Sequence, residues 1–373
     1  MLDFLRFPVG KSRGRRYPEP EHPYRSPFQR DRDRIVHARA FRRLEAKTQV
    51  FTPRLSDHFR NRLTHTIEVA QISRTVAAAL GLDEDLTEAL ALVHDIGHPP
   101  FAHAGEEELD RQVRRFSESF DHNLHALRIV ESFEQRYARF PGLNLTFEVR
   151  EGIVKHSRDL ERGESGPLAE YLPGLKPPLE AQLIDLADEV AYNTADLDDG
   201  FAALMFTADE ISSEVEAFAE IHETTQTQFP GASERERFQE SLRQLIDLLV
   251  SGLMDGTLGS VRQAGVESVE DIRQYPKRLV SFTVEAGQAS RQLKQFLYRQ
   301  VYSTRPLAEE RTRAAAQVAN LFQFFLESPQ KLPESYRNQT AQEPLHRVIC
   351  DYIAGMTDGY FLRVFEQMLE PGQ

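Results

Sequence analysis

LDEDLTEALALVHDIGHPPFAHAGEE, residues 82–107, contains the clearest secondary-structure pattern in the sequence. Its apolar residues recur at the spacing that brings them onto one face of an α-helix, at Leu86, Leu90 and Val93. Asp83 is a suitable N-cap, and the acidic residues after it favour the positive end of the helix dipole. Pro99 and Pro100 cannot continue a helix. The stretch therefore predicts an amphipathic helix that ends in a His–Asp pair.

Helical periodicity extends over most of the chain. Before residue 82, one helix face carries Val69, Ile72, Val76 and Ala79, and Gly81 suits a helix C-terminus. Further helices are predicted at 120–137, 179–199, 207–223, 233–254, 286–302, 307–328 and 345–368. Residues 143–149 alternate like a strand, but their short length favours a loop that leads into a helix. A short hairpin near 277–283 and loops at 158–178 and 328–342 complete a fold that is predicted to be mainly α.

Composition points to a globular protein without a membrane segment. The 373 residues are 40% hydrophobic and 28% charged, which allows a sizeable core. No stretch reaches the roughly 18–20 apolar residues of a membrane span, and the N-terminal charges follow the apolar patch, unlike a secretory signal. Cys350 is the lone cysteine, which fits a reducing compartment. We therefore expect a cytoplasmic protein that does not contact membranes.

The net charge of −13 argues against non-specific nucleic-acid binding, but basic residues are unevenly distributed. Thirteen arginines, Arg54 among them, lie between Lys11 and Arg62. A basic segment in an acidic protein suits a small polyanionic ligand. The alternative is a solvated surface whose arginines pair with nearby acids.

Histidines concentrate around the His–Asp pair. Seven of the 12 lie within fewer than 70 residues: His58, His65, His94, His98, His103, His122 and His125. His94 and Asp95 can direct a nitrogen and an oxygen at one ion, which suits Mn, Fe, Mg or Zn. His65 and Asp188 are the best further ligands, because an ionised Asp188 on an apolar helix face is costly unless it is paired. Alternatively, His65 is a hydrogen-bonded core histidine and Asp188 pairs with an arginine.

Six segments in the same order resemble one known family. They are YRSPFQRDRDRIVHARAFRRLEAKTQVF (24–51), RNRLTHTIEVAQ (60–71), HDIGHPPFAHAGE (94–106), FDHNLHALRIVE (120–131), LIDLADEVAYNTADLDDG (183–200) and CDYIAGMTDGY (350–360). The chain is similar to the bacterial deoxyguanosine triphosphate triphosphohydrolases (dGTPases) of the HD superfamily, especially their shorter branch.

The resemblance implies a fold and a reaction. The fold is an HD-domain helical bundle with a helical C-terminal extension and at most a short β-hairpin. Residues 1–60 form an arginine-rich segment that contributes to the nucleotide pocket, 61–215 the metal-binding core, and 216–373 a helical region for packing or oligomerisation. Members cleave a deoxynucleoside triphosphate (dNTP), such as dGTP, at the α-phosphate, which yields the deoxynucleoside and tripolyphosphate.

Individual positions match the family's functional residues. The metal ligands correspond to His65, His94, Asp95 and Asp188, which hold one divalent ion per subunit: Mn²⁺ or Mg²⁺, with Fe, Co, Ni or Zn as alternatives. His103 matches a catalytic histidine and Glu106 its acidic partner. The substrate-binding positions are Arg43, Gln49, Arg62, His98, His122, Tyr192 and Asp196.

Chemistry supports these assignments. A divalent ion acts as a Lewis acid on the α-phosphate, and the departing O5′ needs a proton that a histidine with a pKa near 7 can supply. His103 and Glu106 are three residues apart, so they can touch on one helix. Tyr192 lies one turn after Asp188, where it would exclude a ribose 2′-hydroxyl. The alternatives are that His103 is a helix cap or core histidine and that Tyr192 is an ordinary buried tyrosine.

Three positions depart from the pattern. Ala195 replaces a histidine frequent in the family, Glu189 stands where the related animal enzyme has lysine, and Gly359 replaces an arginine. They affect base specificity, phosphate affinity and any effector site more than the reaction type.

Relatives are oligomers, often hexamers, so we expect an even-numbered homo-oligomer. A dNTP effector or single-stranded DNA is a further expected partner. Two other functions stay open: an HD-type nucleotidase or phosphodiesterase, and a nucleotide-sensing or DNA-binding regulatory protein without hydrolase activity.

Overall fold

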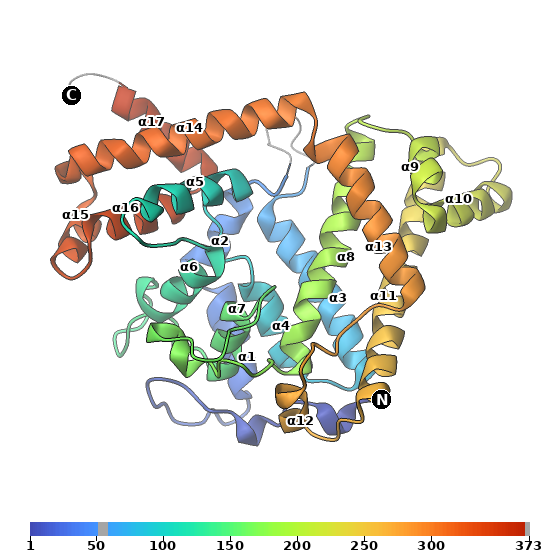
Figure 1. The fold of residues 1–373 in the computed structure, drawn as a ribbon, viewed down its shortest axis with the longest axis horizontal. Helices are drawn as coiled ribbons and strands as arrows, with labels where there is room; N and C mark the ends of the chain where they lie inside the picture. Colours follow the sequence, from blue (N-terminus) through green and yellow to red (C-terminus); the bar gives the residue numbers. More distant parts are fainter. Residues whose placement is uncertain (51–58, 370–373) are drawn as a thin grey trace. The chain divides into compact units, whose positions relative to one another are not determined.

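The computed structural model describes residues 1–50 and 59–369, and within them the chain is helical without a β-sheet (Figure 1). The predicted mainly-α fold class is confirmed. Isolated bridges join Arg15 to Thr146 and Thr48 to Asn61. Two positions of the basic segment and histidine cluster, Arg54 and His58, lie outside the described residues.

The chain divides into two compact units, each assembled from three separated segments. Unit 1 comprises residues 1–32, 65–92 and 146–304, and unit 2 comprises 33–64, 93–145 and 305–373. The predicted division into residues 1–60, 61–215 and 216–373 stays a prediction.

Unit 1 is built around the helix α8 (Leu179–Ala202), which packs on α11 (Glu234–Ala264) and α13 (Val284–Leu297). Figure 1 labels these three helices, in green, yellow and orange. Its other elements are η1 (Asp3–Leu5), η2 (Val9–Lys11), α3 (Arg62–Leu80), α4 (Glu84–Val93), α7 (Phe147–Val154), η5 (Gly166–Glu170), α9 (Ala208–Glu214), α10 (Glu216–Gln228), α12 (Val269–Gln274) and η6 (Tyr298–Tyr302). Three helices include residues of both units: α1 (Pro27–Val36), α3, whose residues 62–64 belong to unit 2, and α4, whose last residue, Val93, does too.

The core of unit 1 contains leucines and valines from segments far apart in the sequence. Its buried members include Leu5, Val76, Leu80, Leu179, Leu183, Leu253, Val261 and Leu279. These residues come from η1, α3, α8, α11 and the loop before α13, so burial of their apolar surface holds the discontinuous segments together.

Unit 2 is organised by the helix α14 (Arg305–Glu327), which packs along α5 (Ala102–Arg114), α16 (Leu345–Ala354) and α17 (Asp358–Leu369). Its remaining elements are α2 (Arg39–Arg43), η3 (Leu44–Ala46), α6 (His122–Arg128), η4 (Ile129–Phe133), η7 (Pro329–Lys331), α15 (Glu334–Arg337) and η8 (Asn338–Ala341). The core between these helices includes Leu109, Val113, Val318, Leu321, Phe322, Ile349, Ile353 and Phe361.

Most predicted helices form, but their ends depend on packing. α11 extends ten residues beyond the predicted end at Met254, past Gly256, where a Cβ atom would lie 2.3 Å from the backbone of Phe282. Two predicted helices are interrupted: 207–223 breaks at Val215, and 345–368 breaks between α16 and α17. The helix predicted at 120–137 ends early, at Phe133.

Two irregular segments settle the questions that periodicity left open. Residues 143–149 form the predicted loop into a helix, with α7 beginning at Phe147. The hairpin near 277–283 is absent, because the Gln182 side chain accepts the backbone N–H groups of Leu279 (2.7 Å) and Val280 (3.4 Å). A side chain thus satisfies donors that a partner strand would otherwise need to satisfy. None of the described helices is both long and apolar enough to cross a membrane.

Candidate metal and phosphate site

The His–Asp pair lies directly after α4, as the sequence predicts. His94 and Asp95 occupy a tight turn in which the Ile96 N–H donates to Val93 and the His98 N–H donates to Asp95, both at 3.2 Å. Gly97 makes this turn compatible with α6. A Cβ atom at residue 97 would lie 2.0 Å from the His122 carbonyl oxygen and 2.5 Å from the Ala126 nitrogen. The absence of a side chain therefore lets the start of α6 approach the pair.

Asp95 is a buried carboxylate held by cations within unit 2. Arg62 donates to its Oδ2 at 2.6 Å, and the two side chains are only 3% and 7% exposed. The Oδ1 atom lies 3.1 Å from His98 Nδ1 and 3.6 Å from His94 Nε2. Burial alone would raise the pKa of Asp95, but Arg62 and the two histidines outweigh it and hold the pKa well below the ordinary value. Asp95 is therefore anionic, as a metal ligand must be.

The three further histidines predicted for the site gather around Glu106. The rings of His98 and His122 stack with centroids 3.9 Å apart, and the ring centroid of His103 lies 5.9 Å from that of His98. Glu106 Oε1 accepts from both the backbone N–H (2.9 Å) and Nδ1 (2.7 Å) of His122, whereas its Oε2 lies 3.6 Å from His103 Nδ1. The predicted His103–Glu106 pair is thus present, but the closer hydrogen bond of Glu106 goes to His122.

Burial and neighbouring charges shift the pKa values of His98 and Glu106 within this cluster. Burial lowers the pKa of His98 well below its usual value, and Arg62 and His122 lower it further, so His98 is neutral. Burial opposes ionisation of Glu106, but its interactions with His103 and His122 hold the pKa of the carboxyl far below the ordinary range. The cluster therefore offers a neutral imidazole beside a carboxylate that is firmly ionised.

The segment before His103 is conformationally strained. Phe101 and Ala102 both have positive φ angles, 63° and 53°, which side-chain-bearing residues rarely adopt. The carboxylate of Asp358, on α17, accepts the Phe101 N–H at 3.1 Å and thereby supports this turn. α5 begins immediately afterwards and leaves the His103 side chain 77% exposed. His103 is therefore a solvent-accessible imidazole rather than a core histidine.

The other two predicted metal ligands meet inside unit 1. His65 on α3 lies with its Nε2 atom 2.8 Å from Asp188 Oδ1 on α8, and the histidine side chain is 1% exposed. Ligand atoms about 2.0–2.2 Å from one ion stand roughly 3–4 Å apart. The donor pair His65–Asp188, like the pair His94–Asp95 in unit 2, fits that separation. Both pairs supply the imidazole and carboxylate donors that divalent metals bind.

The sugar-side residues predicted on α8 have polar neighbours in unit 1. Tyr192 is half-buried, and burial together with nearby acids raises the pKa of its hydroxyl, so the phenol stays neutral. Asp196 accepts a hydrogen bond from the Tyr302 hydroxyl. Lys294 on α13 lies 2.6 Å from Glu189 and 5.8 Å from the centre of the Tyr192 ring. A cation therefore stands beside Glu189, where the related animal enzyme has its lysine.

Two residues of this neighbourhood were missed by the sequence analysis. Lys47 is fully buried, donates to the carbonyls of His98 and Ala354 (3.1 Å for the latter), and burial lowers its pKa to about 7. His156, after α7, has a ligand atom within 4.8 Å of one on Asp188 and lies 2.8 Å from Asp185. Lys47 lies within the matched segment 24–51 and His156 lies outside all six segments, but the contacts of both depend on tertiary packing.

The two remaining predicted substrate residues lie in unit 2. Arg43 donates to the Gly355 carbonyl at 2.8 Å and lines a pocket that includes none of His98, His103 or His122. Gln49 is partly buried.

Comparisons with known proteins agree with this chemistry. The HD domain family model matches residues 62–193, and the model of a phosphohydrolase-associated domain matches residues 280–367. A relative from Geobacter sulfurreducens, named deoxyguanosinetriphosphate triphosphohydrolase-like protein, is 43% identical over 362 residues, covering 97% of this chain and 93% of the relative. Relatives of the same name from Bordetella pertussis (44% over 366 residues; 97% and 94% covered) and Caulobacter sp. (43% over 373 residues; 96% and 94% covered) are similarly close.

Proposed function

The chain belongs to the family of deoxyguanosinetriphosphate triphosphohydrolase-like proteins, and on this premise we propose that it hydrolyses dNTPs, dGTP among them, to deoxynucleoside and tripolyphosphate. Membership of a family with HD and phosphohydrolase-associated domains makes it a phosphohydrolase. The observation that supports the finer proposal is the unit 2 cluster, in which Arg62 and His98 hold the buried Asp95, and His103 and His122 flank Glu106.

We propose that one divalent ion, Mn²⁺ or Mg²⁺, is held by His65, His94, Asp95 and Asp188. The order of these residues in the sequence supports the set, as do the donor separations within each pair. When bound, such an ion supplies Lewis-acid polarisation of the α-phosphate. Arg62 keeps Asp95 ionised at neutral pH, so that this carboxylate can act as a ligand.

The proton for the leaving O5′ atom is assigned to His103. Its exposed imidazole can reach a bound substrate, and its Nδ1 atom lies 3.6 Å from Glu106, the acidic partner that the resemblance implies. Glu106 also fixes His122 through two hydrogen bonds, which orients that ring toward the same space. Glu106 therefore lies between His103, which is proposed as the acid, and His122, which is proposed as an N–H donor to phosphate oxygens.

The remaining predicted positions are assigned to substrate binding. Arg62, His98 and His122 are assigned to the triphosphate, and the Arg62 guanidinium has further N–H donors besides the one that Asp95 accepts. Tyr192 and Asp196 suit the deoxyribose, while Arg43 and Gln49 belong to the nucleoside-facing segment. Lys294 joins this proposal as the cation beside Glu189.

Incubation with each of the four dNTPs and Mn²⁺ or Mg²⁺, followed by ³¹P NMR, tests the reaction. Tripolyphosphate as the phosphorus product supports the proposal. Orthophosphate or pyrophosphate would instead indicate an HD-type nucleotidase or phosphodiesterase. Asp95→Ala should abolish turnover, whereas Asp209→Ala, at an exposed position on α9, should leave it unchanged. Nucleotide binding without turnover under all these conditions would favour the nucleotide-sensing regulator.

We also propose an even-numbered oligomer, such as a hexamer, in the cytoplasm. Assaying dNTPs singly and as mixtures, with and without single-stranded DNA, separates substrate from effector. Turnover that needs a mixture would identify a dNTP effector. Light scattering on the purified protein gives the oligomeric state, and elemental analysis identifies the metal.

A further inference from the structure

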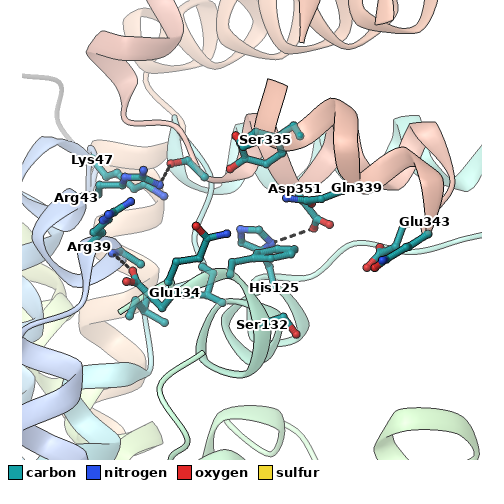
Figure 2. Close-up of a pocket in the computed structure, with 18 residues that line it drawn as sticks. Arg39, Arg43, Lys47, His125, Ser132, Glu134, Ser335, Gln339, Glu343 and Asp351 are labelled. Atoms are coloured by element: carbon teal, nitrogen blue, oxygen red, sulfur yellow. Dashed lines mark hydrogen bonds and ion pairs between the residues drawn. The ribbon is translucent and has the colours of Figure 1, made fainter. Parts of the chain in front are cut away.

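Unit 2 contains a second polar pocket, of about 510 Å³, between α2, the α6–η4 segment and the α15–α16 region (Figure 2). Its volume lies within the roughly 300–1,000 Å³ range of small-molecule sites. Most side chains around it are polar, so it suits a hydrophilic ligand.

One end of the pocket is cationic. Figure 2 shows Arg39, Arg43 and Lys47 on the same side of the space. Arg39 makes no hydrogen bond or ion pair with any residue that the structure describes, and Arg43 uses one N–H for the Gly355 carbonyl. The two arginines stand at i and i+4 on α2, where like charges repel. An anion between them would relieve that repulsion and satisfy their open donors.

The acidic side chains of the pocket have partners of their own. Asp351 and Glu343 both accept from Arg128, at 2.6 Å and 2.5 Å. Glu134 accepts the Ala40 N–H at 2.7 Å. Asp351 and Glu343 thus share one arginine and Glu134 accepts only a neutral N–H, so the place for an anion is the end of the pocket at Arg39 and Arg43, not the pocket as a whole.

A buried histidine provides an independent sign of a ligand. His125 is 2% exposed and lies in the middle of the pocket in Figure 2, and its Nε2 atom has no hydrogen-bonding partner among the described residues. Its Nδ1 atom faces Asp351 at 3.4 Å. With a proton on Nδ1, the neutral ring presents Nε2 as an acceptor. A ligand hydroxyl would satisfy this buried atom.

We propose that this pocket binds a sugar phosphate, with its phosphate between Arg39 and Arg43 and a sugar hydroxyl donating to His125. The amide of Gln339 and the hydroxyl of Ser335 line the space for the remainder of the ligand. The chemistry is shared by free phosphosugars and by mononucleotides. The pocket lacks the cluster around Glu106 but shares Arg43 with the proposed substrate-binding residues, so its occupancy is tested at Arg39, which has no part in the proposed hydrolase reaction.

Calorimetric titration of the full chain with ribose 5-phosphate, ribose and deoxyguanosine monophosphate tests the site. We expect a phosphate ester to bind and ribose not to bind. Arg39→Ala should weaken binding of that ester at least about tenfold, because it removes charge-assisted hydrogen bonds. Arg42→Ala is the matched control: it lies on the same helix, is exposed and does not line the pocket, so binding should change less than about twofold.

The two esters distinguish the sources of the ligand. Tighter binding of ribose 5-phosphate identifies a free phosphosugar, and tighter binding of the monophosphate identifies a nucleotide. The proposal is overturned if neither ester binds at concentrations up to about 10 mM. It is also overturned if Arg39→Ala and Arg42→Ala weaken binding equally, or if binding is lost in Asp95→Ala but kept in Arg39→Ala. If the protein passes these binding tests but has no hydrolase activity, the proposal for this pocket stands and only the proposed function is rejected.

Discussion

Replacement of Glu180 with glutamine should make the stability of the protein less sensitive to pH. Glu180 is fully buried at the start of α8, and its Oε1 atom accepts the backbone N–H groups of Phe7 (2.9 Å) and Asp83 (3.0 Å). Burial raises the pKa of this carboxyl to about 7, although the two N–H groups oppose the increase. A glutamine can accept the same two hydrogen bonds without ionising.

The sign and size of the effect follow from proton linkage. A carboxyl whose pKa is higher in the folded than in the unfolded chain contributes its full stability below the unfolded pKa. That stability is lost as the pH rises through the folded pKa. Each pKa difference of one is worth about 1.4 kcal/mol, so an increase from 4.5 to about 7 corresponds to about 3 kcal/mol. The wild-type protein should lose this amount between about pH 4.5 and 7.

Urea denaturation of both proteins across this pH range measures the difference in the free energy of unfolding. The free energy of unfolding of Glu180→Gln, relative to that of wild type, should rise by about 3 kcal/mol between pH 4.5 and 8. A pH-independent difference between the two proteins does not affect this change. Glu285→Gln, at an exposed position on α13, is the control and should track wild type at every pH. A difference between Glu180→Gln and wild type that does not change with pH would refute the reasoning.

Three further outcomes are expected. Arg62→Met leaves Asp95 buried without its cation, so urea denaturation should show a free energy of unfolding lower by about 3–5 kcal/mol. Adding Asp95→Asn should recover the lost stability. An unchanged urea midpoint in Arg62→Met would contradict the pairing. His103→Ala should lower kcat for dNTP hydrolysis by about 10²–10⁴-fold while leaving Tm unchanged, since the side chain is exposed; full activity would remove His103 from the mechanism. Gly97→Ala should cost about 1–3 kcal/mol in thermal unfolding, because its Cβ atom would overlap the His122 carbonyl; a stable variant would show that α6 can move aside.

Periodicity located the helices well because helix formation depends on neighbours three and four residues apart. It did not locate every end. The extension of α11 past Gly256 depends on close packing against Phe282, which a local pattern does not contain. Similarly, Gln182 lies about a hundred residues before the segment whose backbone donors it satisfies, and this contact replaces the hairpin considered for 277–283.

The candidate site was partly predictable for the same reason. His94 and Asp95 are adjacent, and His103 and Glu106 are one helical turn apart, so their proximity follows from local geometry. The stronger hydrogen bond of Glu106 to His122 bridges 16 residues and does not follow from either motif.

The sequence by itself determined the helical class, the metal-ligand candidates and the family, because these are written in local spacing and residue type. Only the tertiary structure decided that Lys47 reaches the His98 carbonyl and that Arg128 holds Asp351, 223 positions away. Packing of the apolar faces determines which buried donors and acceptors come into contact, and therefore which residues pair. Their protonation depends on burial that no isolated segment possesses.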